Sequence, residues 1–169
     1  MNAHVFVTQG LWGIMNKSLL CYLSVLPFVS GCAQSRVGEF DFAEGVVQHA
    51  IPVDEMPWKP CPPNLPPGCE IAVLEGNPRA AGMFTVRFRL SEDFVMPPHT
   101  HPQDERVTVL KGRMAVAFGP NGTREDAREF RPGDYYVNAR GAVHTVWASQ
   151  SSEIQITGFG PWEAHFIDR

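Results

Sequence analysis

Hydrophobic and polar residues alternate along most of the chain after residue 69. The clearest case is residues 83–90, where Phe84, Val86, Phe88 and Leu90 share one face and polar residues fill most positions between them. A period of two predicts a β-strand with one buried face. The pattern predicts seven further strands, at residues 70–74, 105–110, 113–118, 135–137, 143–147, 153–157 and 164–167.

Turn residues separate these segments at short intervals. Lys111-Gly112 and residues 131–134 (Arg-Pro-Gly-Asp) are typical turn sequences. Only residues 123–128 have the composition of a helical turn, and residues 46–51 are a further strand candidate. Many short strands at even spacing favour an all-β fold, either a closed barrel or a double-sheet barrel.

Length, composition and charge narrow the function classes. The 169 residues allow one domain with a single core. The formal net charge of −4, without any cluster of Lys or Arg, excludes the electrostatic surface of a nucleic-acid-binding protein. Four cysteines are too few for a disulfide scaffold.

The N-terminal residues read as an exported leader rather than as part of the fold. Lys17 is the only charged side chain before residue 36, and a short apolar stretch follows it and ends at Gly31-Cys32. A positive residue, an apolar stretch and then small residues form the layout of a secretory signal peptide. The alternative is a buried N-terminal strand or helix of the domain.

The residues Val29-Ser30-Gly31-Cys32 resemble the lipobox of bacterial lipoproteins, which are cut before a cysteine that becomes lipid-modified. The resemblance implies a leader over residues 1–31, with Met15 as the start that gives it the usual proportions. It also implies a lipid anchor at Cys32 as the sole membrane attachment, and a periplasmic location in the cell envelope.

Residues 32–68 are predicted to form a tether and a proline-rich arm that precede a β-barrel domain at residues 69–169. Seven prolines lie between residues 52 and 67, and proline cannot donate to a β-ladder. Cys61 and Cys69 flank the last part of this arm. They form either a small disulfide-closed loop or two unpaired thiols.

The candidate chemistry lies in two segments. His99 and His101 are two residues apart, so their imidazoles project from the same face of an extended chain. Glu105 follows after a short turn, and His144 comes from a later strand. Three imidazoles and one carboxylate form a suitable ligand set for a divalent transition metal. The alternative is that these histidines are ordinary surface or core residues, as we interpret His49 and His165.

These residues resemble the two motifs of the cupin superfamily. The first motif is complete, with His99, His101, Glu105 and Gly112 at the family's spacing. The second has Gly133, Gly141 and His144 in place and departs from the pattern at Ala139 and Ala148. The resemblance implies a double-stranded β-helix with iron, manganese, zinc, nickel or copper bound by His99, His101, Glu105 and His144. It further implies a homodimer.

The resemblance leaves two function classes open. The first is a metal-dependent enzyme that acts on a small organic molecule, with dioxygenase-like chemistry. The second is a non-catalytic cupin that binds or senses a metal or a small ligand. A third possibility is a purely structural barrel whose site binds no metal, and it would leave all four candidate ligands without a function. Met114, Tyr136 and Trp147 are candidates for the pocket wall, with ordinary packing as the alternative.

Overall fold

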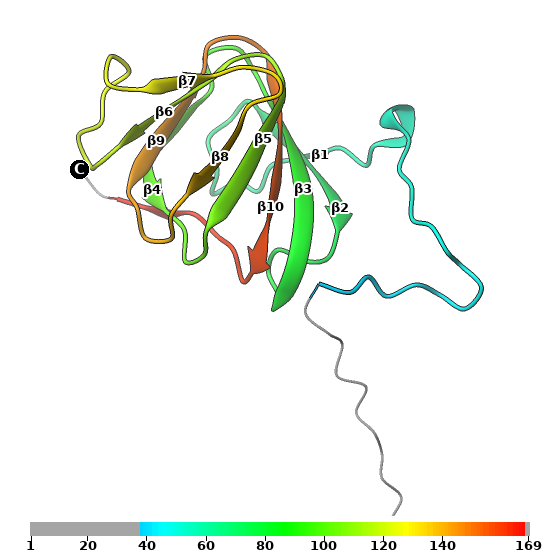
Figure 1. Ribbon diagram of the computed structural model, residues 1–169. Coiled ribbons are helices and arrows are strands. Elements are labelled where there is room, and N and C mark those ends of the chain that lie inside the picture. Colours follow the sequence, from blue (N-terminus) through cyan, green and yellow to red (C-terminus); the bar gives the residue numbers. More distant parts are fainter. Residues whose placement is uncertain (1–37, 168–169) are drawn as a thin grey trace, which may run out of the picture. The chain divides into compact units, whose positions relative to one another are not determined.

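A computed structural model describes residues 38–167, whose regular secondary structure is almost entirely β-strand (Figure 1). The strands form two antiparallel sheets. The first has the order β1-β2-β3-β10-β5-β8 and the second β11-β4-β9-β6-β7. The predicted all-β double-stranded β-helix is therefore confirmed. The predicted leader and lipid-anchor residues lie outside the described residues.

Within residues 38–167, the strands and the one short helix have the following bounds. The 3₁₀ helix η1 covers Val53–Glu55, and the strands are β1 Lys59–Pro60, β2 Cys69–Glu75, β3 Gly82–Leu90, β4 Val95–Thr100, β5 Glu105–Lys111, β6 Met114–Phe118, β7 Arg128–Phe130, β8 Tyr135–Asn138, β9 His144–Ala148, β10 Ser152–Gly160 and β11 His165–Phe166. In the described part of the chain, no helix has the length and apolar character needed to cross a membrane.

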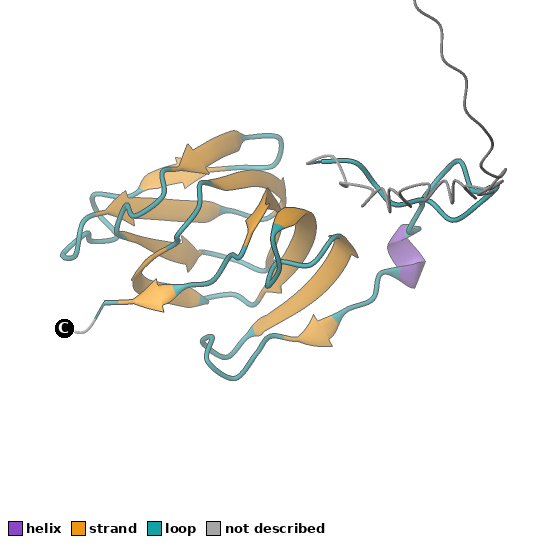
Figure 2. Cartoon of the chain, turned by 90° about the horizontal axis from the view of Figure 1, so that it is seen from below, coloured by secondary structure: helices purple, strands orange, loops and turns teal. Residues whose placement is uncertain are grey.

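The core lies between the two sheets (Figure 2). Strands β3 and β10 pair along nine residues, from Leu90 opposite Ser152 to Gly82 opposite Gly160. The even-numbered apolar residues of β3 point inward, as the alternation predicts, and meet Met114 and Val116 of β6 in the other sheet. Burial of these apolar side chains is the main force that holds the two sheets together.

Three local predictions needed correction. Residues 46–51 form no strand and are mostly exposed; the His49 ring contacts Leu74 O of β2 at 3.0 Å, but no backbone ladder forms there. Residues 123–128 form no helical turn of their own: one hydrogen bond from Ala127 N to Arg124 O (3.3 Å) closes a turn, and Arg128 already begins β7. The sequence pattern also missed β1, β4 and β7.

Gly112 is required by the turn between β5 and β6. Its φ is +83°, a conformation that residues with a Cβ rarely adopt. A Cβ at this position would collide with the Ser152 side chain and lie 2.6 Å from the Ser151 carbonyl oxygen. The glycine of the first motif therefore allows β5 to turn into β6 directly against the start of β10.

The proline-rich arm joins the first sheet through β1, which pairs with β2. Cys61 and Cys69 form a disulfide with a Cα–Cα distance of 5.6 Å, so of the two alternatives the structure has the disulfide-closed loop. Cys61, Leu65 and Cys69 pack against the core cluster. The loop between the two cysteines is thus part of the barrel wall. The predicted domain boundary at residue 69 coincides with the start of β2 and stays a prediction.

Replacing both Cys61 and Cys69 by serine is expected to lower the free energy of unfolding by about 2–3 kcal/mol. The nine-residue loop that the disulfide closes would regain chain entropy in the unfolded state. Urea unfolding of the two proteins, with and without a reductant, measures the difference. A reductant that leaves the wild-type midpoint unchanged would contradict a stabilising role for this disulfide.

Candidate metal centre

The structure brings the four predicted ligands together at one end of the barrel. His99 lies in β4, His101 directly after it, and Glu105 and His144 are the first residues of β5 and β9. His99 and His144 are opposite each other in the β4–β9 ladder. All four side chains are buried, with exposed fractions between 1% and 6%. Strands from both sheets therefore build this cluster.

The nitrogen and oxygen atoms of the cluster converge on one point. Ring nitrogens of His99, His101 and His144 lie within 4.8 Å of one another. The Glu105 carboxylate reaches two of them, with 3.4 Å from Oε1 to His101 Nε2 and 3.4 Å from Oε2 to His144 Nε2. Atoms that each bind a common ion at about 2 Å would be separated by distances of this order.

Backbone carbonyls fix the orientation of all three imidazoles. His99 Nδ1 donates to Pro97 O (2.7 Å), His101 Nδ1 to Glu163 O (2.7 Å) and His144 Nδ1 to Ala142 O (3.0 Å). A carbonyl only accepts, so each Nδ1 carries the proton and each Nε2 keeps its lone pair in the neutral ring. His101 Nε2 and His144 Nε2 are buried without a hydrogen-bond partner. Such outward bonding of Nδ1 is typical of metal-ligating histidines.

The electrostatics of the cluster suit a cation. Burial lowers the pKa of His99 to about 4, and burial also lowers that of His101, so both are neutral at pH 7. Burial opposes the ionisation of Glu105, but hydrogen bonding and charge interactions with its neighbours outweigh it and hold the Glu105 pKa at about 2. Burial would lower the pKa of His144, yet the contact with Glu105 raises it. A divalent cation would balance the buried carboxylate in place of that proton.

Asn138 orients the carboxylate ligand. It is the register partner of Glu105 in the β5–β8 ladder, and its Nδ2 donates to Glu105 Oε2 at 2.8 Å. Asn138 is 2% exposed. Sequence reasoning missed this residue. The sequence shows an amide side chain at the end of the strand in the second motif. That this amide faces Glu105 can be recognised only when the β5–β8 register is known.

The loops of the two motifs are tied to each other. Arg140 donates from its backbone N to Asp104 Oδ1 (3.0 Å) and from Nε to the same oxygen (3.1 Å). Gly141 N donates to His101 O at 2.9 Å. These bonds hold the loop before His144 against the turn between His101 and Glu105, so the spacing between the ligands is set by the backbone.

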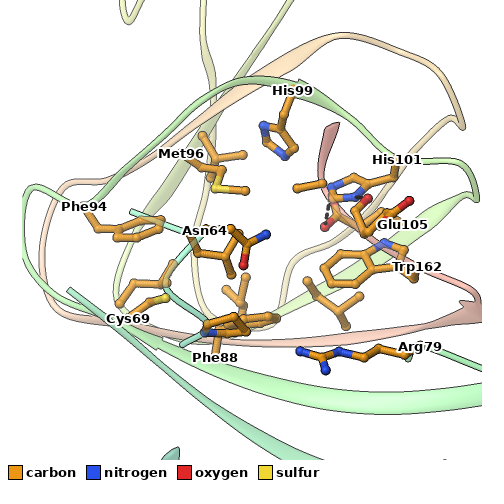
Figure 3. Close-up of a pocket in the computed structure, with 18 of the residues that line it drawn as sticks. Asn64, Cys69, Arg79, Phe88, Phe94, Met96, His99, His101, Glu105 and Trp162 are labelled. Atoms are coloured by element: carbon orange, nitrogen blue, oxygen red, sulfur yellow. Dashed lines mark hydrogen bonds and ion pairs between the residues drawn. The ribbon is translucent and has the colours of Figure 1, made fainter. Parts of the chain in front are cut away.

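A cavity of about 510 Å³ opens beside the cluster (Figure 3). His99, His101 and Glu105 form part of its wall, and most of the remaining wall is apolar, including Phe88, Phe94 and Met96. The arrangement matches a small-molecule site in which a few polar groups face an apolar cavity.

Further residues on the cavity wall were not predicted from the sequence. The Trp162 ring stacks on His101, with centroids 4.6 Å apart and an interplanar angle of 13°. Asn64, Arg79 and Glu163 also line the cavity. No motif marks these positions, because the fold brings them in from the arm, the β2–β3 turn and the segment after β10. Met114, Tyr136 and Trp147 pack elsewhere, as the alternative reading held.

A double-sheet β barrel with this histidine and carboxylate cluster at one end defines a cupin domain. Comparison with family models identifies the particular family. The model described as "ChrR Cupin-like domain" matches residues 46–163, and the chain belongs to that family.

Known proteins have regions of similar sequence or similar structure. A germin-like protein of Arabidopsis thaliana is 31% identical over 80 residues, which are 46% of this chain and 37% of the relative, so the chain spans little more than a third of that protein. The polyketide cyclase RemF of Streptomyces resistomycificus has a TM-score of 0.60 at 17% identity, covering 73% of this chain and 87% of its own. An acetylacetone dioxygenase of Acinetobacter johnsonii has a TM-score of 0.58 at 19% sequence identity, and the match covers 77% of this chain and 85% of the dioxygenase chain. At these low sequence identities, the structural similarity shows only that the fold is shared.

Proposed function

We propose that this protein is a metal-dependent enzyme that acts on a small organic molecule with dioxygenase-like chemistry. The observation that carries the proposal is the convergence of His99, His101, Glu105 and His144 at one end of a cavity with mostly apolar walls. Three imidazole nitrogens and one carboxylate suit iron, manganese, nickel, copper or zinc. Two proteins of similar fold, a dioxygenase and a cyclase, belong to the same general class of small-molecule chemistry.

In this proposal the chain's own residues bind and shield the reacting molecule. When bound, the metal would supply Lewis-acid polarisation and a template for substrate and O₂. The apolar side chains of the cavity exclude water and orient the carbon skeleton of the substrate. Trp162 covers the face of His101, which restricts the side from which a molecule approaches this ligand.

A second candidate function is a non-catalytic cupin that binds or senses a metal or a small ligand. One observation favours it. Apart from Glu105, the acidic side chain on the cavity wall is Glu163, and its Oε1 is held by His165 Nε2 at 2.6 Å. The described wall residues therefore include no carboxylate that is both outside the metal cluster and unpaired, as a general base would be.

Metal analysis followed by O₂-uptake assays distinguishes these functions. The protein from residue 33 onward is purified, its metal content is measured, and O₂ consumption is screened with small phenols, diketones and thiols. One equivalent of metal with turnover of any of these supports the enzyme. Full metal occupancy without turnover supports the binding protein. Metal content far below one equivalent, even after incubation with each of the five metals, would refute the enzyme and the metal-binding form of the second candidate.

We further propose that the protein is exported and held in the bacterial envelope by a lipid at Cys32. The support is the sequence of residues 17–32. Labelled palmitate should be incorporated into the full chain and not into a Cys32→Ser variant, and incorporation that survives this change would refute the anchor.

We also propose, from the cupin resemblance, that the protein is a homodimer. Light scattering measures the mass in solution, and a monomer mass would refute this proposal.

A further inference from the structure

Outside the metal-ligand cluster, the cavity wall carries the polar side chains of Asn64, Arg79 and Glu163 among mostly apolar residues. The metal-ligand cluster forms one end, and Arg79 stands on another part of the wall. Figure 3 shows Arg79 and His99 on opposite sides of the cavity, with the Trp162 ring between Arg79 and His101. A molecule that fills this space would therefore meet a cation at one end and the metal ligands at the other.

The backbone holds Arg79 in this position. The β2–β3 turn is closed by Ala80 N donating to Asn77 O (3.0 Å), and Arg79 N donates to the side-chain Oδ1 of the same Asn77 (2.9 Å). Trp162 N donates to Pro78 O at 2.7 Å. These bonds fasten the turn that carries Arg79 to the segment that carries Trp162, so both residues belong to one piece of the cavity wall.

Arg79 also differs from most arginines of the domain in its charge environment. Arg113 pairs with Glu129 at 2.8 Å and Arg140 with Asp104 at 3.1 Å. Within residues 38–167, the Arg79 guanidinium has neither a hydrogen bond nor an ion pair. Glu163 on the same wall is held by His165. Arg79 is an exposed residue on the cavity wall, and no group among residues 38–167 pairs with its guanidinium.

We propose that the ligand of this cavity is an amphipathic organic anion. Its carboxylate binds the Arg79 guanidinium, its apolar body lies along Phe88, Leu90 and Ile154, and its other end faces the histidine cluster. A guanidinium recognises a carboxylate through two parallel hydrogen bonds, which a neutral molecule of the same shape cannot match in charge. The inference rests on the proposed function, since it assigns the substrate class of that same cavity.

Calorimetric titration with octanoate and octanamide tests this assignment. The two probes have the same apolar chain and differ in the charge of the head group. The decisive titrations use chelator-treated full-length protein at neutral pH, where no bound cation competes for the carboxylate. We expect octanoate to bind about fivefold more tightly than octanamide, which is the size of a charge-assisted contact at a partly exposed site, and the preference to shrink with added salt.

Variants of Arg79 attribute the preference to this side chain. R79Q should bind both probes equally, R79K should keep part of the preference, and R131Q, which changes an exposed arginine outside the cavity wall, should behave as wild type. Equal binding of the two probes by wild-type protein, or a preference that survives R79Q, would overturn the inference. Metal content measured in parallel tests the proposed function separately, because the octanoate preference does not depend on a metal.

Discussion

Replacing His101 by alanine is expected to lower the affinity for a divalent transition metal by more than about 100-fold. Loss of a residue that only orients a ligand typically costs 10–100-fold, and loss of a ligand costs more. His101 contributes a buried Nε2 that faces the Glu105 carboxylate and the other two imidazoles. Competition with a chromophoric chelator, together with elemental analysis of the dialysed protein, measures the loss.

His165→Ala is the matched control for this experiment. His165 has the same side chain, lies in β11 close in sequence to the cavity wall, and is exposed with its Nε2 on Glu163. The control should retain wild-type affinity and stoichiometry. Equal metal binding by wild type and His101→Ala would show that the cluster is not the metal site, whatever the fold resembles.

Asn138→Ala is expected to have a smaller effect, a loss of about 10–100-fold in metal affinity. The substitution leaves all four ligands in place and removes the hydrogen bond that orients Glu105 Oε2. The same chelator competition measures it, with circular dichroism as a check on folding. An affinity equal to wild type would mean that the β5 backbone alone fixes the carboxylate.

The clustering of the four candidate ligands was predictable from the sequence because their spacing reflects strand geometry. His99 and His101 share a face at a separation of two residues, and Glu105 begins the next strand after a tight turn. His144 was identified through the glycines that precede it. The structure brings the four side chains into a common buried cluster, and their role as metal ligands stays a prediction.

The rest of the cavity was not predictable from the same pattern. Trp162 and Arg79 are distant from the motifs in sequence. They reach the wall through the segment after β10 and the β2–β3 turn, which are joined by a backbone hydrogen bond from Trp162 N to Pro78 O. Asn138 depends on the register between β5 and β8. Local spacing contains no information about such pairings, which are set by packing of the whole barrel.

The strands also differ in how well the local sequence pattern predicted them. Strict alternation in β3 predicted its inward face, whereas β4 was missed because Pro97 and Pro98 lie in its middle. The ladder accommodates them at a register shift between Met96 and His99, where β4 departs from regular pairing with β9. Prolines in a strand are tolerated at such irregularities. In this protein the irregularity directly precedes the first metal ligand.

Packing of the core extends to the candidate metal centre through one aromatic contact. Phe84 is fully buried in β3, and its ring centroid is 5.6 Å from that of Trp162. Gly158 on the paired strand leaves room for the ring, since a Cβ there would lie 3.1 Å from Phe84 Cζ. Trp162 in turn stacks on His101. Phe84 therefore supports both the sheet-to-sheet core and the side chain that covers a ligand.

Phe84→Ala is accordingly expected to lower the free energy of unfolding by about 3–5 kcal/mol, the range for removing a buried aromatic ring. Phe159→Ala, which truncates a phenylalanine that is 41% exposed on β10, should cost about 1 kcal/mol or less. Urea unfolding of both variants measures these values. Because the cavity left by Phe84 lies under Trp162, tryptophan fluorescence of the folded protein should shift in Phe84→Ala and stay unchanged in Phe159→Ala. Equal stability losses in the two variants would contradict the role assigned to Phe84.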